Sequence, residues 1–252
     1  MTDSTRFAKV LKTPEVIALA FGAMIGWSWV LLTGVWLTAA GTIGTLIAFC
    51  VGGLAVTLIG LTYSELAAAM PKAGGEHIYT QRALGSRWSF VCTWALLFSY
   101  VNVCMFEAVA LPSAVEYLYP DIRLGTLWNV LGSDVDLGFI LIGIGATALV
   151  TWVNYLGIRT AAILQAVITA LIVVTGILLI SGAIAFGDAS NAQPWIATPV
   201  SGILIVLIMV PSMLIGFDVI PQSAEEIDLP PNKIGRLLIF SVACAVGWYI
   251  LI

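Results

Sequence analysis

Long apolar runs are the feature of this chain that most constrains its fold. Segments of about twenty apolar residues, long enough to cross the hydrocarbon core of a bilayer, recur along its 252 residues. The predicted spans cover residues 16–40, 45–68, 88–118, 137–156, 161–186 and 200–224, and a seventh begins near Ile234. The runs are continuous and do not alternate with polar residues, which favours helices over barrel strands. We therefore expect an all-α polytopic membrane protein.

The composition agrees with this expectation and narrows the functional classes. Sixty per cent of the residues are apolar, ten per cent are charged, and the mean hydropathy is +1.05. No Walker or dinucleotide-binding motif is present, and no basic aromatic patch indicates a nucleic-acid partner. The single histidine, His77, lies in a predicted loop, and the four cysteines lie in apolar runs without CxxC spacing. We expect reduced thiols, no metal site, no cofactor and no enzymatic activity.

The distribution of positive charge predicts the orientation. Lysine and arginine are enriched on the cytoplasmic side of membrane proteins. With a cytoplasmic N-terminus, only Arg123 falls outside. The inside segments then hold the other nine basic residues: Arg6, Lys9, Lys12, Lys72, Arg82, Arg87, Arg159, Lys233 and Arg236. We expect an integral protein of the cytoplasmic (inner) membrane, with residues 1–15 as a cytoplasmic N-terminal segment.

Two spans contain residues that interrupt helices. In FGAMIGWSW, residues 21–29, Gly22 and Gly26 bracket the three residues AMI. In PSMLIGFDV, residues 211–219, Pro211 and Gly216 bracket the four residues SMLI. Glycine weakens a helix, and proline removes a hydrogen-bond donor. Close packing of helices would also explain glycines here. Because the two interruptions match, we expect broken helices, which are typical of transporter binding sites near the bilayer midplane.

The spacing of the interruptions suggests an internal repeat. Spans one to five, residues 16–186, would form one five-helix unit, and residues 200–252 would begin a second unit of inverted topology. The seventh apolar run continues to Ile252 without a polar flank. We therefore interpret the sequence as an N-terminal portion of a longer protein.

Five stretches resemble one family of permeases. They are GAMIG in span one, AGTIGTLIAFCVGGL entering span two, YSELAAAMPKAGGEHIY leaving it, YLGIRTAAILQAVITAL opening span five, and IGFDVIPQSAEEIDLPPNKIGRLL across span six. Together they resemble the amino acid-polyamine-organocation (APC) superfamily, with its leucine-transporter-like fold of two inverted repeats. The resemblance implies secondary transport, by alternating access, of amino acids or related amines and organic cations.

The resemblance also implies where the substrate binds. Backbone amides of the first interruption would hold a substrate carboxylate, and span-six carbonyls would receive its amine, as helix-end charges favour. The residues implied are Gly22, Ala23, Met24, Ile25, Gly26, Trp27, Ser28, Ile215, Gly216, Phe217 and Asp218.

The chain departs from the family pattern in three places. Trp27-Ser28 stands where relatives commonly have Ser-Gly, and Ser212 replaces a bulky aromatic gate, so Ser212 joins the predicted binding residues and Trp27 or Phe217 the predicted gate. Ile172 stands where some proton-coupled relatives carry a lysine, which argues against that form of coupling. The coupling ion, proton or sodium, stays open.

Carboxylates near or within the spans complete the predicted site. Glu107 lies inside span three, where it would contact the substrate amine, carry a coupled proton, or form a structural hydrogen bond. Asp218 would serve the site or cap the helix that follows it. Glu65 and Glu225 would form gating ion pairs with residues such as Arg82, or would be solvated.

A second function class stays open beside the transporter. The chain could be a truncated, transport-deficient subunit that associates with another membrane protein. The expected partners are a small-molecule substrate and the lipid bilayer, and assembly into a homo-oligomer is left open.

Overall fold

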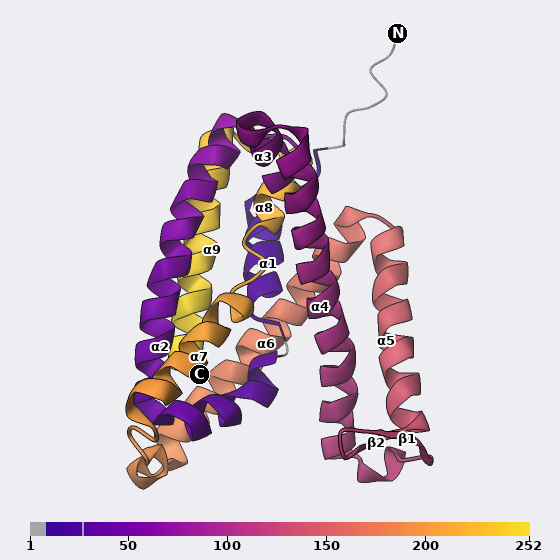
Figure 1. Cartoon of the computed structure of the whole chain (residues 1–252), viewed down its shortest axis with the longest axis vertical. Coiled ribbons are helices and arrows are strands. Elements are labelled where there is room, and N and C mark those ends of the chain that lie inside the picture. The colour runs from indigo at the N-terminus through magenta and orange to yellow at the C-terminus, as the bar shows by residue number, and fades with distance from the viewer. Residues whose placement is uncertain (1–8, 27) are drawn as a thin grey trace. The chain divides into compact units, whose positions relative to one another are not determined.

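The computed structural model describes residues 9–26 and 28–252, which are mainly helical (Figure 1). In chain order the helices are α1 (Thr13–Met24), α2 (Ser28–Ala69), α3 (Glu76–Leu84), α4 (Ser86–Leu118), α5 (Leu137–Tyr155), α6 (Ile158–Phe186), α7 (Pro199–Met213), α8 (Val219–Gln222) and α9 (Pro231–Leu251). Single 3-10 turns occur at Pro120–Ile122 and Ala189–Ala192, and the strands β1 (Thr126–Val130) and β2 (Ser133–Asp136) form an antiparallel hairpin.

The helix lengths confirm an all-α polytopic membrane protein. Within the described residues, α2, α4, α5, α6 and α9 are long and apolar enough to cross a bilayer. Helices α1 and α7 are apolar but shorter, because spans one and six are interrupted. The ribbon of α2 bends at Gly41, where φ is 74° and ψ is 174°. The part of α2 before this bend continues span one, and the part after it forms span two.

The chain divides into two compact units, the first of which combines residues up to Thr93 with residues 162–252. In this unit α2 packs along α7 and α9, and α1 and α8 lie beside α9 (Figure 1). The core contains fully buried side chains from several of these helices, including Trp36 and Phe49 of α2, Val206 of α7 and Leu238 of α9. This unit contains both interrupted spans.

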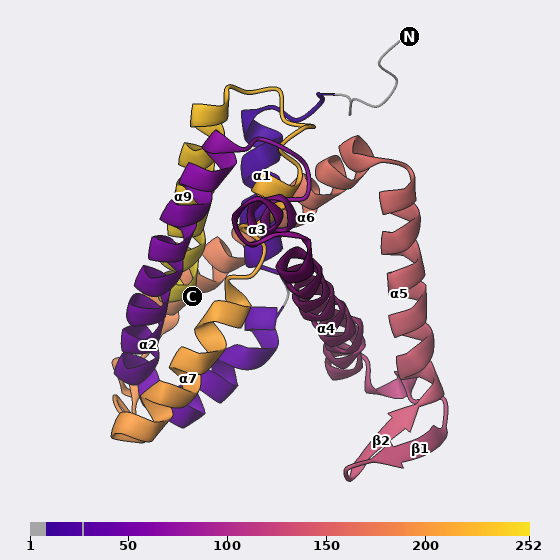
Figure 2. The ribbon, with the colours of Figure 1, turned by 45° about the horizontal axis from the view of Figure 1, so that its top comes forward.

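The second unit, residues 94–161, contains most of α4, the hairpin and α5. Figure 2 shows the two strands at one end of α5. Strand β2 leads directly into α5 through Asp136, which is buried and accepts a hydrogen bond from Thr126 Oγ1 at 3.1 Å. Arg123 pairs with Glu116 and lies 3.8 Å from Asp136. The apolar pattern of the sequence does not predict this hairpin.

Candidate functional site

The first interruption separates α1 from α2. Helix α1 ends at Met24, and the amide of Ile25 still donates to the Phe21 carbonyl at 3.0 Å. The next helix begins at Ser28. The predicted gate and binding residue Trp27 lies outside the described residues, as does the side chain of Ser28. The predicted interruption of span one is confirmed.

Gly22 lies inside helix α1 and not in the interruption that its motif predicts. It lies within α1, where a Cβ atom would overlap the side chains of Gln165 and Thr169 on α6. This glycine therefore allows α6 to approach span one closely, which is the packing role that the sequence left open. The helix ends two residues further on.

The second interruption separates α7 from α8. Helix α7 passes through Pro211 and ends at Met213, and a turn of five residues leads to Val219, the first residue of α8. Within this turn Gly216 has a φ of 122°, a backbone conformation that residues with a side chain rarely adopt. The predicted break in span six is confirmed, and it begins within the segment bracketed by Pro211 and Gly216.

The two interruptions meet in space. A Cβ atom on Gly216 would lie 2.7 Å from the Cβ of Ala23 and 2.9 Å from its carbonyl carbon. Such separations are shorter than van der Waals contact, so only glycine at 216 allows this approach. The sequence places these two motifs almost two hundred residues apart, and the fold brings their backbones into contact.

Tyr249 of α9 joins the ends of both interrupted helices. Its hydroxyl lies 2.9 Å from the carbonyl oxygen of Met24 and 3.2 Å from that of Met213, the last residues of α1 and α7. Carbonyls in the last turn of a helix lack a helical donor, and within a bilayer such groups need a partner. Tyr249 supplies one from a third helix.

The aromatic surroundings hold this tyrosine in place. The Tyr249 ring stacks on Phe49 with a centroid separation of 5.2 Å and meets Trp36 edge-on at 6.0 Å. The adjacent Trp248 meets Phe21 and Trp29 edge-on, on either side of the first interruption. These contacts were not predicted. The only signal in the sequence is a tyrosine in an apolar span, and its partners cannot be deduced from that.

Asp218 holds the turn at the second interruption. It is 7% exposed, and its Oδ1 accepts a hydrogen bond from the Gly216 amide at 3.2 Å. Although Asp218 directly precedes α8, its side chain caps no amide of that helix. Its Oδ2 accepts instead from Gln222 Nε2 at 3.1 Å. The capping role that the sequence allowed is therefore wrong.

The same glutamine reaches a second carboxyl group. Gln222 Nε2 donates to Glu76 Oε2 at 3.3 Å, and Glu76 also forms a side-chain hydrogen bond with Tyr63. The ring of Tyr63 meets the predicted gate residue Phe217 edge-on, with centroids 5.2 Å apart. Polar groups of α2, α3 and α8 therefore gather beside the span-six turn.

Backbone pairing connects the segments that flank the two interrupted spans. The amides of Val10 and Leu11, before α1, donate to the Glu226 carbonyl at 3.0 Å. The Asp228 amide donates to the Leu11 carbonyl at 2.8 Å, forming a parallel bridge between Leu11 and Ile227. Spans one and six thus contact each other at their interruptions and near these ends.

Other predicted binding residues have varied environments. Met24 and Ile25 are buried, Gly26, Ile215 and Phe217 are half-buried, and Ala23 is exposed apart from its contact with Gly216. Ser212 is exposed, and its hydroxyl donates to the Met209 carbonyl of its own helix at 2.7 Å. Glu107 is half-buried in α4 and belongs to the second unit. The binding roles of these residues stay predictions.

The predicted gating carboxylates lie at the surface or near it. Glu65 and Arg82 are exposed and Glu225 is half-buried. Within residues 9–26 and 28–252, no ion pair joins Glu65 or Glu225 to Arg82. Their gating role stays a prediction.

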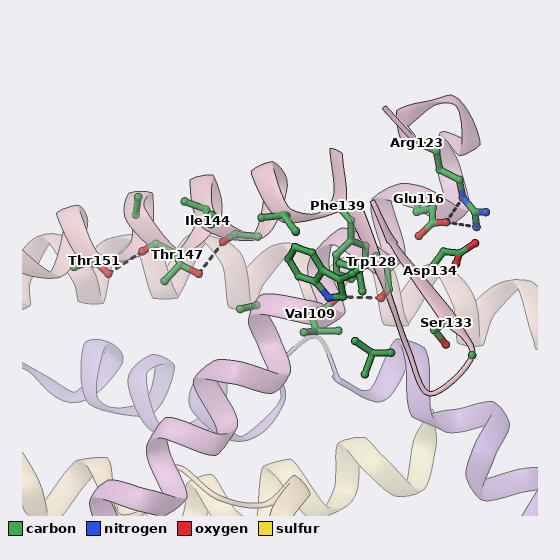
Figure 3. A pocket seen from close by; sticks show the side chains of 18 of the residues that line it. Val109, Glu116, Arg123, Trp128, Ser133, Asp134, Phe139, Ile144, Thr147 and Thr151 are labelled. Carbon is green, nitrogen blue, oxygen red and sulfur yellow. Dashed lines mark hydrogen bonds and ion pairs between the residues drawn. The ribbon is translucent and has the colours of Figure 1, made fainter. Parts of the chain in front are cut away.

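A groove in the second unit contains no predicted site residue. It has a volume of about 1530 Å³ and lies between α4, the hairpin and α5 (Figure 3). Its threonines are turned toward their own helix: Thr147 donates to the Gly143 carbonyl and Thr151 to the Thr147 carbonyl, both at 2.8 Å. Arg123 at its end is paired with Glu116. The groove is mainly apolar, and nothing in it indicates a polar ligand.

The fold and the paired interruptions define an integral membrane protein of the polytopic helical class. Comparison with known families narrows this class. The model of the family "Amino acid permease" matches residues 15–252, so the chain belongs to the amino acid permease family. This agrees with the predicted APC resemblance and with a family of transporters, not enzymes.

Individual relatives resemble the chain over nearly all of its length. It is 26% identical to the branched-chain amino acid permease BcaP of Bacillus subtilis over 94% of this chain and 52% of that protein. Identity to cationic amino acid transporter 4 of Homo sapiens is 26%, over 100% of this chain and 41% of that protein. Identity to a methylthioribose transporter of Bacillus subtilis is 24%, over 99% of this chain and 55% of that protein. The chain thus spans about half the length of these relatives.

Proposed function

We propose that the protein is a secondary transporter of amino acids or related amines that works by alternating access. The substrate is held at the interrupted parts of spans one and six. The observation that carries this proposal is the meeting of the two interruptions at Ala23 and Gly216, with Tyr249 on both helix ends. Freed amides at one helix end attract a carboxylate, and freed carbonyls at another attract an ammonium group.

The substrate class follows from the relatives and from this chemistry. Their names cover branched-chain amino acids, cationic amino acids and methylthioribose. Two of these three carry both a carboxylate and an amine, which suit the two kinds of helix end. The protein resides in the cytoplasmic membrane with its N-terminus inside, as the basic residues favour.

Counterflow tests the proposed function directly. The protein in its full cellular length is reconstituted into liposomes loaded with one unlabelled amino acid, and a trace of the labelled compound is added outside. A transporter working by alternating access exchanges label inward, so we expect transient accumulation above the outside concentration. Branched-chain, cationic and acidic amino acids and simple amines are each tested, with empty liposomes as the control.

The outcomes separate a transporter from a channel and from a transport-deficient interaction subunit. Equilibration of label without transient accumulation would indicate a channel. Absence of any movement, with the protein folded and inserted, would contradict transport and favour the interaction subunit.

A further inference from the structure

A buried carboxyl group lies on the short helix α3, outside the spans. Glu76 is the first residue of α3 and is 6% exposed. The Gly74 amide, just before α3, donates to the Gln222 carbonyl at the end of α8 at 3.2 Å, so α3 is docked on α8 (Figure 1). Burial of a carboxyl group is costly unless it is paired, hydrogen-bonded or neutral.

One of the two carboxyl oxygens of Glu76 has no hydrogen-bond donor among the described residues. Oε2 accepts from Gln222 Nε2, and Tyr63 supplies a further hydrogen bond. Oε1 is buried, and no described residue donates to it; the hydroxyl of Tyr79 is likewise buried without a described partner. An ionised carboxylate can accept several hydrogen bonds, whereas the protonated group needs fewer and carries no charge.

Gln222 connects this carboxyl group to a second one. Its Nε2 carries two hydrogen atoms and donates to both Glu76 Oε2 and Asp218 Oδ2. Asp218 in turn holds the Gly216 amide in the span-six turn. Three hydrogen bonds therefore connect the Glu76 carboxyl group to the span-six interruption, where the substrate is proposed to bind.

Three acidic groups interact with Glu76, while His77, the next residue of α3, has its Nδ1 within hydrogen-bond distance of Ser89 and Thr93. Tyr63 faces it from α2, Tyr79 from α3 and Asp218 from the span-six turn, while Cys92 of α4 acts on Tyr63. Burial is the main cause that raises the pKa of Glu76, and the charge of Asp218 adds to it. The Glu76 backbone amide, Gln222 and Tyr63 oppose this rise in pKa by hydrogen bonding.

We propose that Glu76 is a proton-binding residue of the transporter, connected through Gln222 to Asp218 at the span-six interruption. This inference rests on the proposed function and names its coupled ion. When protonated, Glu76 is neutral and stays buried against α8. When its O–H bond breaks and cytoplasmic water takes the proton, the charge favours an arrangement in which α3 leaves α8 and the carboxylate is hydrated.

The sign of the pH dependence follows from linkage. A carboxyl group whose pKa is raised in one arrangement binds its proton more tightly there, so protonation stabilises that arrangement. The packing of α3 on α8 is therefore favoured at acid pH, and its stability falls as pH rises from the usual carboxyl range through the raised pKa. Glu76→Gln keeps an acceptor for Gln222 and removes this dependence.

The test compares two transport readouts in the same liposomes. Counterflow needs no net proton movement, whereas accumulation against a gradient under an imposed pH difference does. We expect Glu76→Gln to lower the ratio of proton-driven accumulation to counterflow by at least about fivefold, the lower end of typical coupling strengths. Asp228→Asn is the matched control, because it makes the same chemical change at an exposed carboxylate of the same unit and should leave the ratio unchanged.

The outcomes distinguish this inference from the proposed function. A Glu76→Gln ratio equal to that of the wild type overturns the inference. If the wild-type protein shows counterflow but its accumulation does not depend on the imposed pH difference, the inference about Glu76 is also overturned. The proposal that the protein is a transporter is then unaffected. Absence of counterflow removes the proposed function itself.

A second measurement needs no substrate. Infrared difference spectra between acid and alkaline pH should show the carbonyl band of a buried protonated carboxyl group in the wild type. The band should be lost in Glu76→Gln and kept in Asp228→Asn. A wild-type spectrum without such a band would contradict proton binding at Glu76, whatever the transport data show.

Discussion

At the scale of single residues, the span-six turn depends on two side-chain choices. Gly216 combines a positive φ with direct contact to Ala23, and Asp218 closes the turn by accepting the Gly216 amide. The sequence identifies both positions, since a glycine and a carboxylate within an apolar run are unusual. It does not reveal that Asp218 reaches back to the turn and not forward to α8, because this depends on the local backbone path.

Alanine at position 216 should lower the free energy of unfolding more than alanine at another glycine with similar backbone geometry. Gly157 has a φ of 113°, and a Cβ atom added there would meet nothing within 4 Å, so Gly157→Ala introduces backbone strain alone, roughly 1–2 kcal/mol. Gly216→Ala adds overlap with Ala23, for a total loss of roughly 2–5 kcal/mol. Thermal unfolding of both variants in detergent measures the difference. Equal losses would show that the contact with Ala23 contributes nothing.

At the scale of elements, α9 organises the two interrupted helices. One face of α9 packs on α2, and its last turns present Trp248 and Tyr249 to the ends of α1 and α7. Helix ends freed by an interruption require donors, and a neighbouring span is the available source within a bilayer. The sequence predicts α9 as a span but gives no indication of this role.

Removing the Tyr249 hydroxyl should loosen both helix ends together. Tyr249→Phe keeps the ring contacts with Phe49 and Trp36 but leaves the Met24 and Met213 carbonyls without this donor, a cost of about 1–3 kcal/mol. We expect amide hydrogen exchange to accelerate at both Ile25 and Leu214, and substrate affinity to fall. Tyr155→Phe, at an exposed tyrosine, is the control. Faster exchange at one end only would refute a joint role.

At the scale of the whole molecule, the chain is a membrane protein of the amino acid permease family that spans about half the length of its matched relatives. Its orientation is predicted from nine basic residues on one side and Arg123 on the other. The hairpin between α4 and α5 then lies outside, and the segment between α2 and α3 lies inside.

Cysteine labelling in intact cells checks this orientation. In a variant lacking the native cysteines, Leu131→Cys at the exposed hairpin tip should react with a membrane-impermeant maleimide added outside. Lys72→Cys, between α2 and α3, should react only after the membrane is permeabilised. The reverse pattern would place the N-terminus outside.

Local patterns in the sequence predicted much of this architecture. Apolar length identifies the spans, and glycine and proline identify both interruptions. These predictions are correct because each depends on a short stretch of sequence. A bilayer span requires about twenty apolar residues, and a helix ends where its backbone hydrogen bonds are interrupted. The hairpin was missed because its short strands lie in a segment between spans.

The tertiary structure alone decided which groups meet. The approach of Gly216 to Ala23, the reach of Tyr249 to two carbonyls, and the link from Glu76 through Gln222 to Asp218 join residues far apart in the chain. Periodicity and composition determine which residues enter the membrane. They cannot determine partners, because these depend on how several helices pack against one another at once.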